Sequence, residues 1–73
     1  MTFIGLREGS RGPKVEYLQS ILNKLGFNAG NVDGIFGSRT AAALRRFQKS
    51  AGLSQDAIIG ENTWNALLPY LQG

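Results

Sequence analysis

The chain has no cysteine and no histidine among its 73 residues, and it contains only two prolines. Without cysteine and histidine it can form no disulfide and none of the common zinc sites. A domain of this size buries only about 60% of the surface of its unfolded chain and often relies on such crosslinks. Stability must therefore come from a compact apolar core, which a hydrophobic content of 42% can supply.

Long apolar runs are also missing from the sequence. No stretch approaches the roughly 18 apolar residues that a membrane span needs, so we expect no membrane-spanning segment. The N-terminus MTFIGLREGSRG has no basic region followed by an apolar run, and we expect no signal peptide in this chain. The net charge of +3 suits an anionic partner but is also ordinary for a small soluble domain.

Three segments space their apolar residues as one face of an α-helix. The predicted fold is all-α, a small three-helix bundle whose helices are joined by two ordered loops rich in Asp and Gly. We expect helices at about Gly12–Leu25, Ser38–Ala51 and Glu61–Leu68. The expected core consists of Val15, Leu18, Leu22, Leu25, Ile35, Leu44, Phe47, Ile58, Trp64 and Leu67.

Prolines and glycines mark the predicted helix ends. Pro13 suits the first position of a helix, where its missing N–H would have no partner in any case. Gly26 follows the last apolar turn, where a left-handed residue commonly ends a helix. Pro69 disfavours helical geometry at Leu68, so we expect the third helix to end or kink there.

One pattern, D-x-I-x-G-x-x-T-x-x-A-L, occurs twice and begins at Asp33 and at Asp56. Each Asp is expected to fix a turn by accepting backbone hydrogen bonds, and each Ile to anchor its loop in the core. Each Thr is expected to bond back to the start of its helix, as in a capping box. The second copy has Ala57 where the first has Gly34, so we expect its turn to differ in type.

The residues do not predict catalysis or metal binding. A serine nucleophile has no histidine base here, and the five acids are scattered through the sequence. Calcium requires six to eight oxygen ligands, whereas the loop NAGNVDGIFG has one carboxylate. We therefore expect no catalytic residue, no metal site and no cofactor.

A nucleic-acid partner is also not expected. Arg39, Arg45, Arg46 and Lys49 share one face of the second predicted helix, as in phosphate-binding helices. That face lies opposite the apolar stripe, where solvated charges normally fall. It also lacks the Asn and Gln side chains that read base edges.

Three blocks in order carry a resemblance to a known family. They are G-S-x-G-x-x-V-x-x-L-Q, D-G-x-F-G-x-x-T-x-x-A-L-x-x-F-Q and D-x-I-x-G-x-x-T-W-x-x-L, and together they cover about Leu6 to Leu68. With them the chain closely resembles the bacterial peptidoglycan-binding domain family, the small three-helix module of wall-lytic enzymes. The departure is Ala57, where the family usually has Gly.

The resemblance implies a non-catalytic module that binds cell-wall peptidoglycan, both glycan strand and stem peptide, and anchors an attached wall hydrolase in cis. It implies an extracytoplasmic, wall-associated, monomeric domain. We expect residues 1–73 to form this single domain, with its core at about 6–71, excised from a larger wall-acting protein such as an amidase or an endolysin. The alternative is a protein-interaction or pro-domain-like module that covers a linked catalytic domain.

A polymer-binding groove needs an aromatic or aliphatic floor and polar groups that pair with sugar hydroxyls and peptide groups. The first helix, the first loop and the start of the second helix supply such residues. The candidate ligand-binding residues are Tyr17, Gln19, Asn23, Asn31, Asp33, Phe36 and Arg39.

Several candidates also have a structural explanation. Tyr17 would suit a half-buried core position with a solvated hydroxyl, and Gln19 a hydrogen bond between helix and loop. Asp33 is explained equally well as a turn former, and Arg39 as a solvated charge. Phe36 fits either the core of the loop or an exposed floor.

Overall fold

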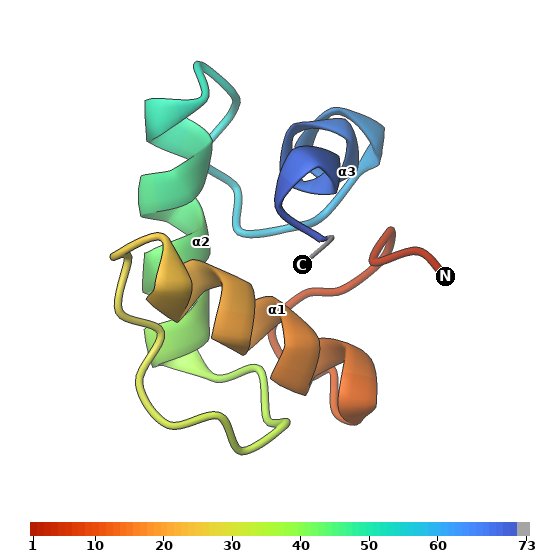
Figure 1. Cartoon of the computed structure of the whole chain (residues 1–73), viewed down its shortest axis with the longest axis vertical. Helices are drawn as coiled ribbons and strands as arrows, with labels where there is room; N and C mark the ends of the chain where they lie inside the picture. The colour runs from red at the N-terminus through yellow and green to blue at the C-terminus, as the bar shows by residue number, and fades with distance from the viewer. Residues whose placement is uncertain (72–73) are drawn as a thin grey trace.

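The computed structural model describes residues 1–71 and contains three α-helices joined by ordered loops (Figure 1). The elements are α1 (Pro13–Lys24), α2 (Ser38–Ser50), α3 (Glu61–Leu67) and a 3-10 turn, η1 (Leu68–Tyr70). Within the described residues there is no strand, and one isolated antiparallel bridge joins Arg11 to Ile35. The all-α prediction is confirmed, and the helix bounds agree with the predicted ones to within one residue.

The helix ends follow the predicted signals. Gly12 is the N-cap of α1 and Pro13 its first residue. Beyond α1, Gly26 has a φ of +91°, and the N–H of Phe27 donates to the carbonyl of Leu22 at 2.9 Å. This pattern pairs carbonyls that the end of a helix leaves open. After α3 the chain tightens into η1, with Pro69 inside the turn.

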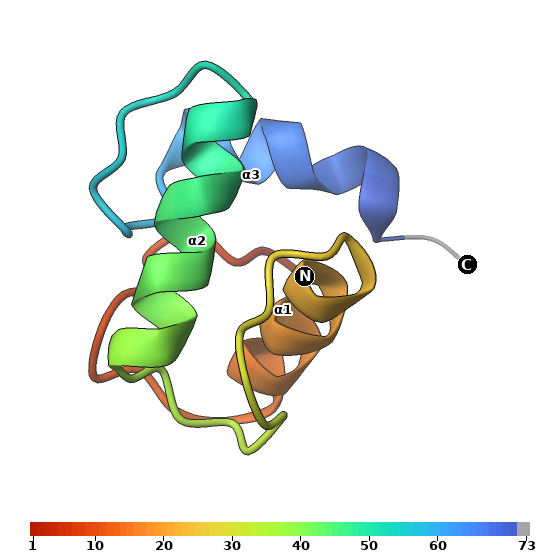
Figure 2. The same cartoon turned by 90° about the vertical axis from the view of Figure 1, so that its left-hand side faces the viewer.

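The helices pack around one another without forming a parallel bundle. α1 lies against α2, and Figure 2 shows α3 starting behind the upper part of α2 and running above α1. The longest of these helices, α2, has 13 residues. None of the helices in residues 1–71 is long and apolar enough to span a membrane.

Side chains from the helices and both loops meet in one apolar core. Leu25 and Trp64 lie at its edge, partly buried and packed against it. Two predicted core positions were wrong, because Ile35 is 46% exposed and Ile58 is only partly buried. The predicted residues that are buried are Val15, Leu18, Leu22, Leu44, Phe47 and Leu67.

The core residues of the two loops lie one position further along than predicted. Phe36 is 1% exposed and Ile59 is fully buried. Their N–H groups donate to the carbonyls of Ser10 and Leu6, each at 3.0 Å, as in paired strands. Neighbouring residues on a paired, extended segment point to opposite sides. Only one residue of each apolar pair can therefore face the core, and the preceding isoleucine faces outward.

The N-terminal segment, residues 3–12, forms backbone hydrogen bonds with both loops. Figure 1 shows it passing between α1 and α3. The N–H of Gly5 donates to Ile59 O at 2.8 Å, and the N–H of Gly9 donates to Phe36 O at 2.9 Å. Phe3 is fully buried among aromatic rings, 5.6 Å from the ring centre of Tyr17 and 5.0 Å from that of Trp64. This segment extends the core before residue 6, where the sequence analysis began it.

We predict that Phe3→Ala lowers the free energy of unfolding by about 3–5 kcal/mol, because it empties a fully enclosed aromatic site. Its neighbour Ile4 is 50% exposed, so Ile4→Ala serves as the control. That control should change stability by no more than about 0.5 kcal/mol. Urea denaturation measures both. Equal effects of the two variants would contradict the role given to the N-terminal segment.

Candidate binding site

The first loop is held by one buried side chain, Gln19 of α1, which is 1% exposed. Its Nε2 group donates to Thr40 Oγ1 at 3.0 Å, to the carbonyl of Ile35 at 3.0 Å and to Asp33 Oδ1 at 3.1 Å. Its Oε1 atom accepts from the N–H of Gly34 at 3.0 Å. One amide group thus connects α1, the loop and the start of α2.

The second loop repeats this network atom for atom around Gln48 of α2, which is fully buried. Its Nε2 group donates to Asp56 Oδ1 at 2.9 Å and, at 3.2 Å each, to the carbonyl of Ile58 and Thr63 Oγ1. Its Oε1 atom accepts from the N–H of Ala57 at 3.0 Å. The repeated pattern in the sequence therefore encodes a repeated glutamine-centred network.

The network corrects the predicted role of the two threonines. Their hydroxyls accept from the glutamine amides, and the N-caps of α2 and α3 are Gly37 and Gly60, which make no side-chain cap bond. The capping-box prediction for Thr40 and Thr63 was therefore wrong. The true partner of each Thr hydroxyl is a Gln. In the sequence, this Gln is the last residue of the L-Q pair in the first helix and of the F-Q pair in the second.

The turns at Gly34 and Ala57 are alike, contrary to the prediction that they differ in type. Both residues have positive φ, +75° and +57° respectively. A Cβ on Gly34 would lie 3.3 Å from the carbonyl oxygen of Gly12 and 3.1 Å from Glu16 Cγ. In the first copy a Cβ would therefore be tightly packed as well as strained in φ. Ala57 is held in a left-handed conformation that costs an L-residue about 1–2 kcal/mol.

Hydrogen bonds lower the pKa values of both loop aspartates. The N–H of Ile35 and the amide of Gln19 bond to Asp33 and hold the pKa of its carboxyl below the ordinary 3.8. The N–H of Ile58 and the amide of Gln48 do the same for Asp56, and the charge of Arg7 adds to the lowering of its pKa. Both aspartates are thus ionised turn formers.

The lowered pKa values predict a stability that depends on pH. A carboxylate with a lower pKa in the folded state stabilises the fold above its unfolded pKa, and this contribution is lost as the pH falls through the folded value. We expect the free energy of unfolding to drop below pH about 4. The double variant Asp33→Asn/Asp56→Asn should lose less over this range, because it keeps the acceptor oxygens but cannot titrate there. Urea denaturation between pH 7 and 2 tests this, and equal losses in both proteins would contradict it.

The first loop and the start of α2 enclose a shallow concavity of about 280 Å³, here called the first hollow. It brings together four of the seven predicted site residues. Gln19 and Thr40 are buried, while Arg39, Asn31 and Ile35 are exposed. The lining residues are Gln19, Ala29, Asn31, Asp33, Ile35, Gly37, Ser38, Arg39 and Thr40.

The side chain of Arg39 lies against the first loop at this hollow. A Cβ on Gly30 would lie 3.0 Å from Arg39 Cδ, so the arginine stem runs over the glycine backbone. Asn23 holds that backbone in turn, since its Nδ2 group donates to the carbonyl of Gly30 at 2.9 Å and its Oδ1 atom accepts from the N–H of Ala29. Asn23 is thus a support for the hollow and does not line it.

Two other predicted site residues lie elsewhere. Phe36 is 1% exposed and belongs to the core, so its prediction as a ligand-binding floor is corrected by its burial. Tyr17 is partly buried, and its hydroxyl donates to the carbonyl of Leu71. Its ring lines a separate apolar concavity beside Trp64 and Leu68.

Two lining residues, Ile35 and Ser38, were not predicted from the sequence as part of the site. Ile35 was expected in the core, but the adjacent apolar pair of Ile35 and Phe36 was a signal that one of them would face outward. In an extended loop that pairs with another segment, successive side chains alternate between faces. No comparable signal distinguishes Ser38 from other polar residues at a helix start.

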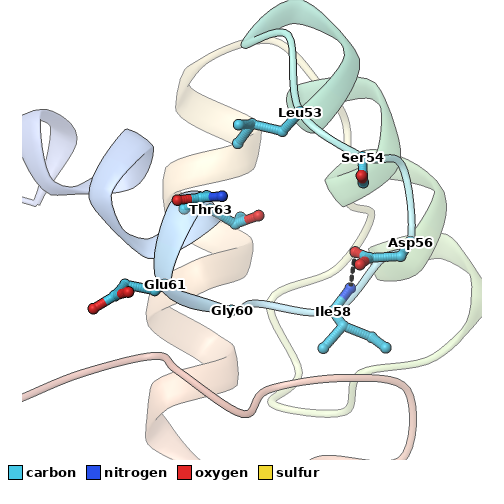
Figure 3. Close-up of a pocket in the computed structure, with 8 residues that line it drawn as sticks. Leu53, Ser54, Asp56, Ile58, Gly60, Glu61 and Thr63 are labelled. Atoms are coloured by element: carbon cyan, nitrogen blue, oxygen red, sulfur yellow. Dashed lines mark hydrogen bonds between the residues drawn. The ribbon is translucent and has the colours of Figure 1, made fainter.

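A second hollow of about 250 Å³ occupies the equivalent place in the second copy (Figure 3). Figure 3 shows Leu53 and Ser54 on the loop that leaves α2, and Thr63 at the start of α3 on the opposite side. The lining residues are Leu53, Ser54, Asp56, Ile58, Gly60, Glu61, Asn62 and Thr63.

The fold and its paired loops define a small binding module. The chain matches the family described as "Putative peptidoglycan binding domain" over residues 11–67. It therefore belongs to the peptidoglycan-binding domain family, whose members are non-catalytic modules, and the predicted resemblance is confirmed.

Known proteins with this domain support the assignment. The chain is 43% identical over 63 residues to the spore cortex-lytic enzyme of Bacillus cereus, covering 86% of this chain and 24% of that enzyme. It superposes on the N-terminal domain of SleB with a TM-score of 0.88, 38% identity and 99% coverage of both chains. A Burkholderia AP3 phage endolysin gives a TM-score of 0.82 at 41% identity, covering 90% of this chain and 25% of the endolysin. The chain spans about half or less of the length of the curated relatives that it matches.

Proposed function

We propose that this domain binds peptidoglycan at the first hollow and holds a linked wall hydrolase against that polymer. The family membership supports the polymer, and the chemistry of the hollow supports the place. The observation that carries the proposal is the lining of one concavity by a guanidinium, an amide and an exposed aliphatic side chain, those of Arg39, Asn31 and Ile35.

Each of these groups suits a part of a stem peptide. The planar guanidinium of Arg39 can pair with a carboxylate through two parallel hydrogen bonds. The amide of Asn31 can both donate to and accept from a peptide group. The exposed face of Ile35 gives an apolar side chain of the peptide a surface to cover.

The hollow is shallow, so a single contact leaves little free energy after the costs of association. A repeating polymer compensates for weak single sites, because a released domain finds another copy of its ligand at high local concentration. A monomeric domain acting outside the cytoplasm, at the wall, fits this mode. Its role as one module of a larger protein is in keeping with relatives of which it spans only 24% or 25%.

Co-sedimentation with purified peptidoglycan sacculi tests the proposal. We predict that the wild-type domain sediments with sacculi and that Arg39→Ala weakens this binding about two- to fivefold, the range for an exposed ion pair. Lys49→Ala is the control, because it removes the same charge from the last turn of α2, outside the first hollow.

Two results would separate the parts of this proposal. Failure of the wild-type domain to sediment with sacculi would reject the polymer. Equal weakening by Arg39→Ala and Lys49→Ala would reject the first hollow and leave only net charge as the cause.

Asp33→Ala should lower the melting temperature more than the binding per folded molecule. Loss of binding at an unchanged melting temperature would reject the role of Asp33 as a turn former.

A further inference from the structure

The two hollows share one scaffold but differ in charge at equivalent positions. The repeat aligns Asn31 with Ser54, Ser38 with Glu61, and Arg39 with Asn62. Among the lining residues of the second hollow there is no cation. The group that would attract a stem-peptide carboxylate in the first hollow is thus replaced by a neutral amide in the second.

The remaining lining of the second hollow consists of hydrogen-bonding and apolar groups. Asn62 and Ser54 can each donate and accept, while the carboxylates of Asp56 and Glu61 can accept from hydroxyl groups. Figure 3 shows the Glu61 side chain pointing away from Asp56, so the two acids do not converge as the ligands of a cation would. Leu53 adds an apolar wall opposite α3 (Figure 3).

We infer that the second hollow is a subsite for an uncharged N-acetylhexosamine unit of the glycan strand, an inference that rests on the proposed function. An acetamido group combines an amide, which Asn62 and Ser54 can pair with, and a methyl group, which Leu53 can cover. Sugar hydroxyls can donate to the carboxylates that line this hollow, whereas a stem-peptide carboxylate finds no cation among its lining residues. The volume of about 250 Å³ lies below the roughly 300–1,000 Å³ of pockets for drug-sized ligands and suits a single unit.

The division of one polymer between two subsites follows from this assignment. The first hollow takes the charged peptide through Arg39, and the second takes the neutral glycan through Asn62. Because both hollows rest on equivalent glutamine networks, their lining residues can differ without changing the fold. Two weak subsites on one rigid domain would also bind the polymer more tightly than either alone.

Titration with the tetramer of N-acetylglucosamine, a glycan without any peptide, tests the inference by NMR. We expect the tetramer to shift the backbone amide signals of Ser54 and Asn62 and to leave those of Asn31 and Arg39 unchanged. Asn62→Ala should weaken this binding about three- to tenfold, as expected for the loss of one or two neutral hydrogen bonds. Asn65→Ala is the matched control, since Asn65 is an exposed asparagine of the same helix outside the hollow.

Three outcomes would overturn the inference. They are shifts confined to the first hollow, equal effects of the two asparagine variants, and stronger binding of the de-N-acetylated, cationic tetramer. If the domain sediments with sacculi but the tetramer shifts no signal in the second hollow, this inference is wrong while the proposed function stands. If the wild-type domain does not bind sacculi, the proposed function fails, and the inference fails with it.

Discussion

The structure depends on two buried glutamine amides that satisfy the polar groups of two loops. A loop that packs against a core brings backbone N–H and C=O groups with it, and each of these costs about 1–3 kcal/mol when buried unpaired. Gln19 and Gln48 each supply two donor hydrogens and an acceptor in one planar group, which matches a carbonyl, a carboxylate and an N–H in the same turn. In the part of the chain that the structure describes, no buried side-chain nitrogen or oxygen lacks a partner.

These networks also create the surfaces that we propose as binding sites. Each glutamine draws its loop against the start of the following helix, and a hollow forms between the two. The buried residues of the network, such as Thr40 and Thr63, stabilise the fold. Exposed neighbours such as Arg39 and Asn62 can differ in charge without disturbing the network. The domain therefore separates residues that build the loops from residues that meet a ligand.

The helices were predictable from the sequence because they depend on local signals, namely apolar spacing, Pro13 at a helix start and Gly26 beyond a helix end. The identity of the buried loop residue was not, since it depends on pairing with the N-terminal segment, and a one-residue change of register exchanges Ile35 for Phe36. Phe3 was missed for the same reason: its burial comes from tertiary contacts with Tyr17 and Trp64 and leaves no periodic pattern. Four lining residues of the candidate site, Gln19, Asn31, Asp33 and Arg39, were predicted from the sequence, but its apolar contact was expected at Phe36, one residue beyond Ile35.

Hydrogen exchange of glutamine side-chain amides tests the central claim most directly. Gln19 and Gln48 are at most 1% exposed and fully engaged, whereas Gln55 lies on the surface of the second loop. After transfer of the folded domain into D₂O, the NH₂ signals of Gln19 and Gln48 should persist far longer than that of Gln55, because their exchange requires the loops to open. Exchange of either buried amide as fast as Gln55 would contradict the account.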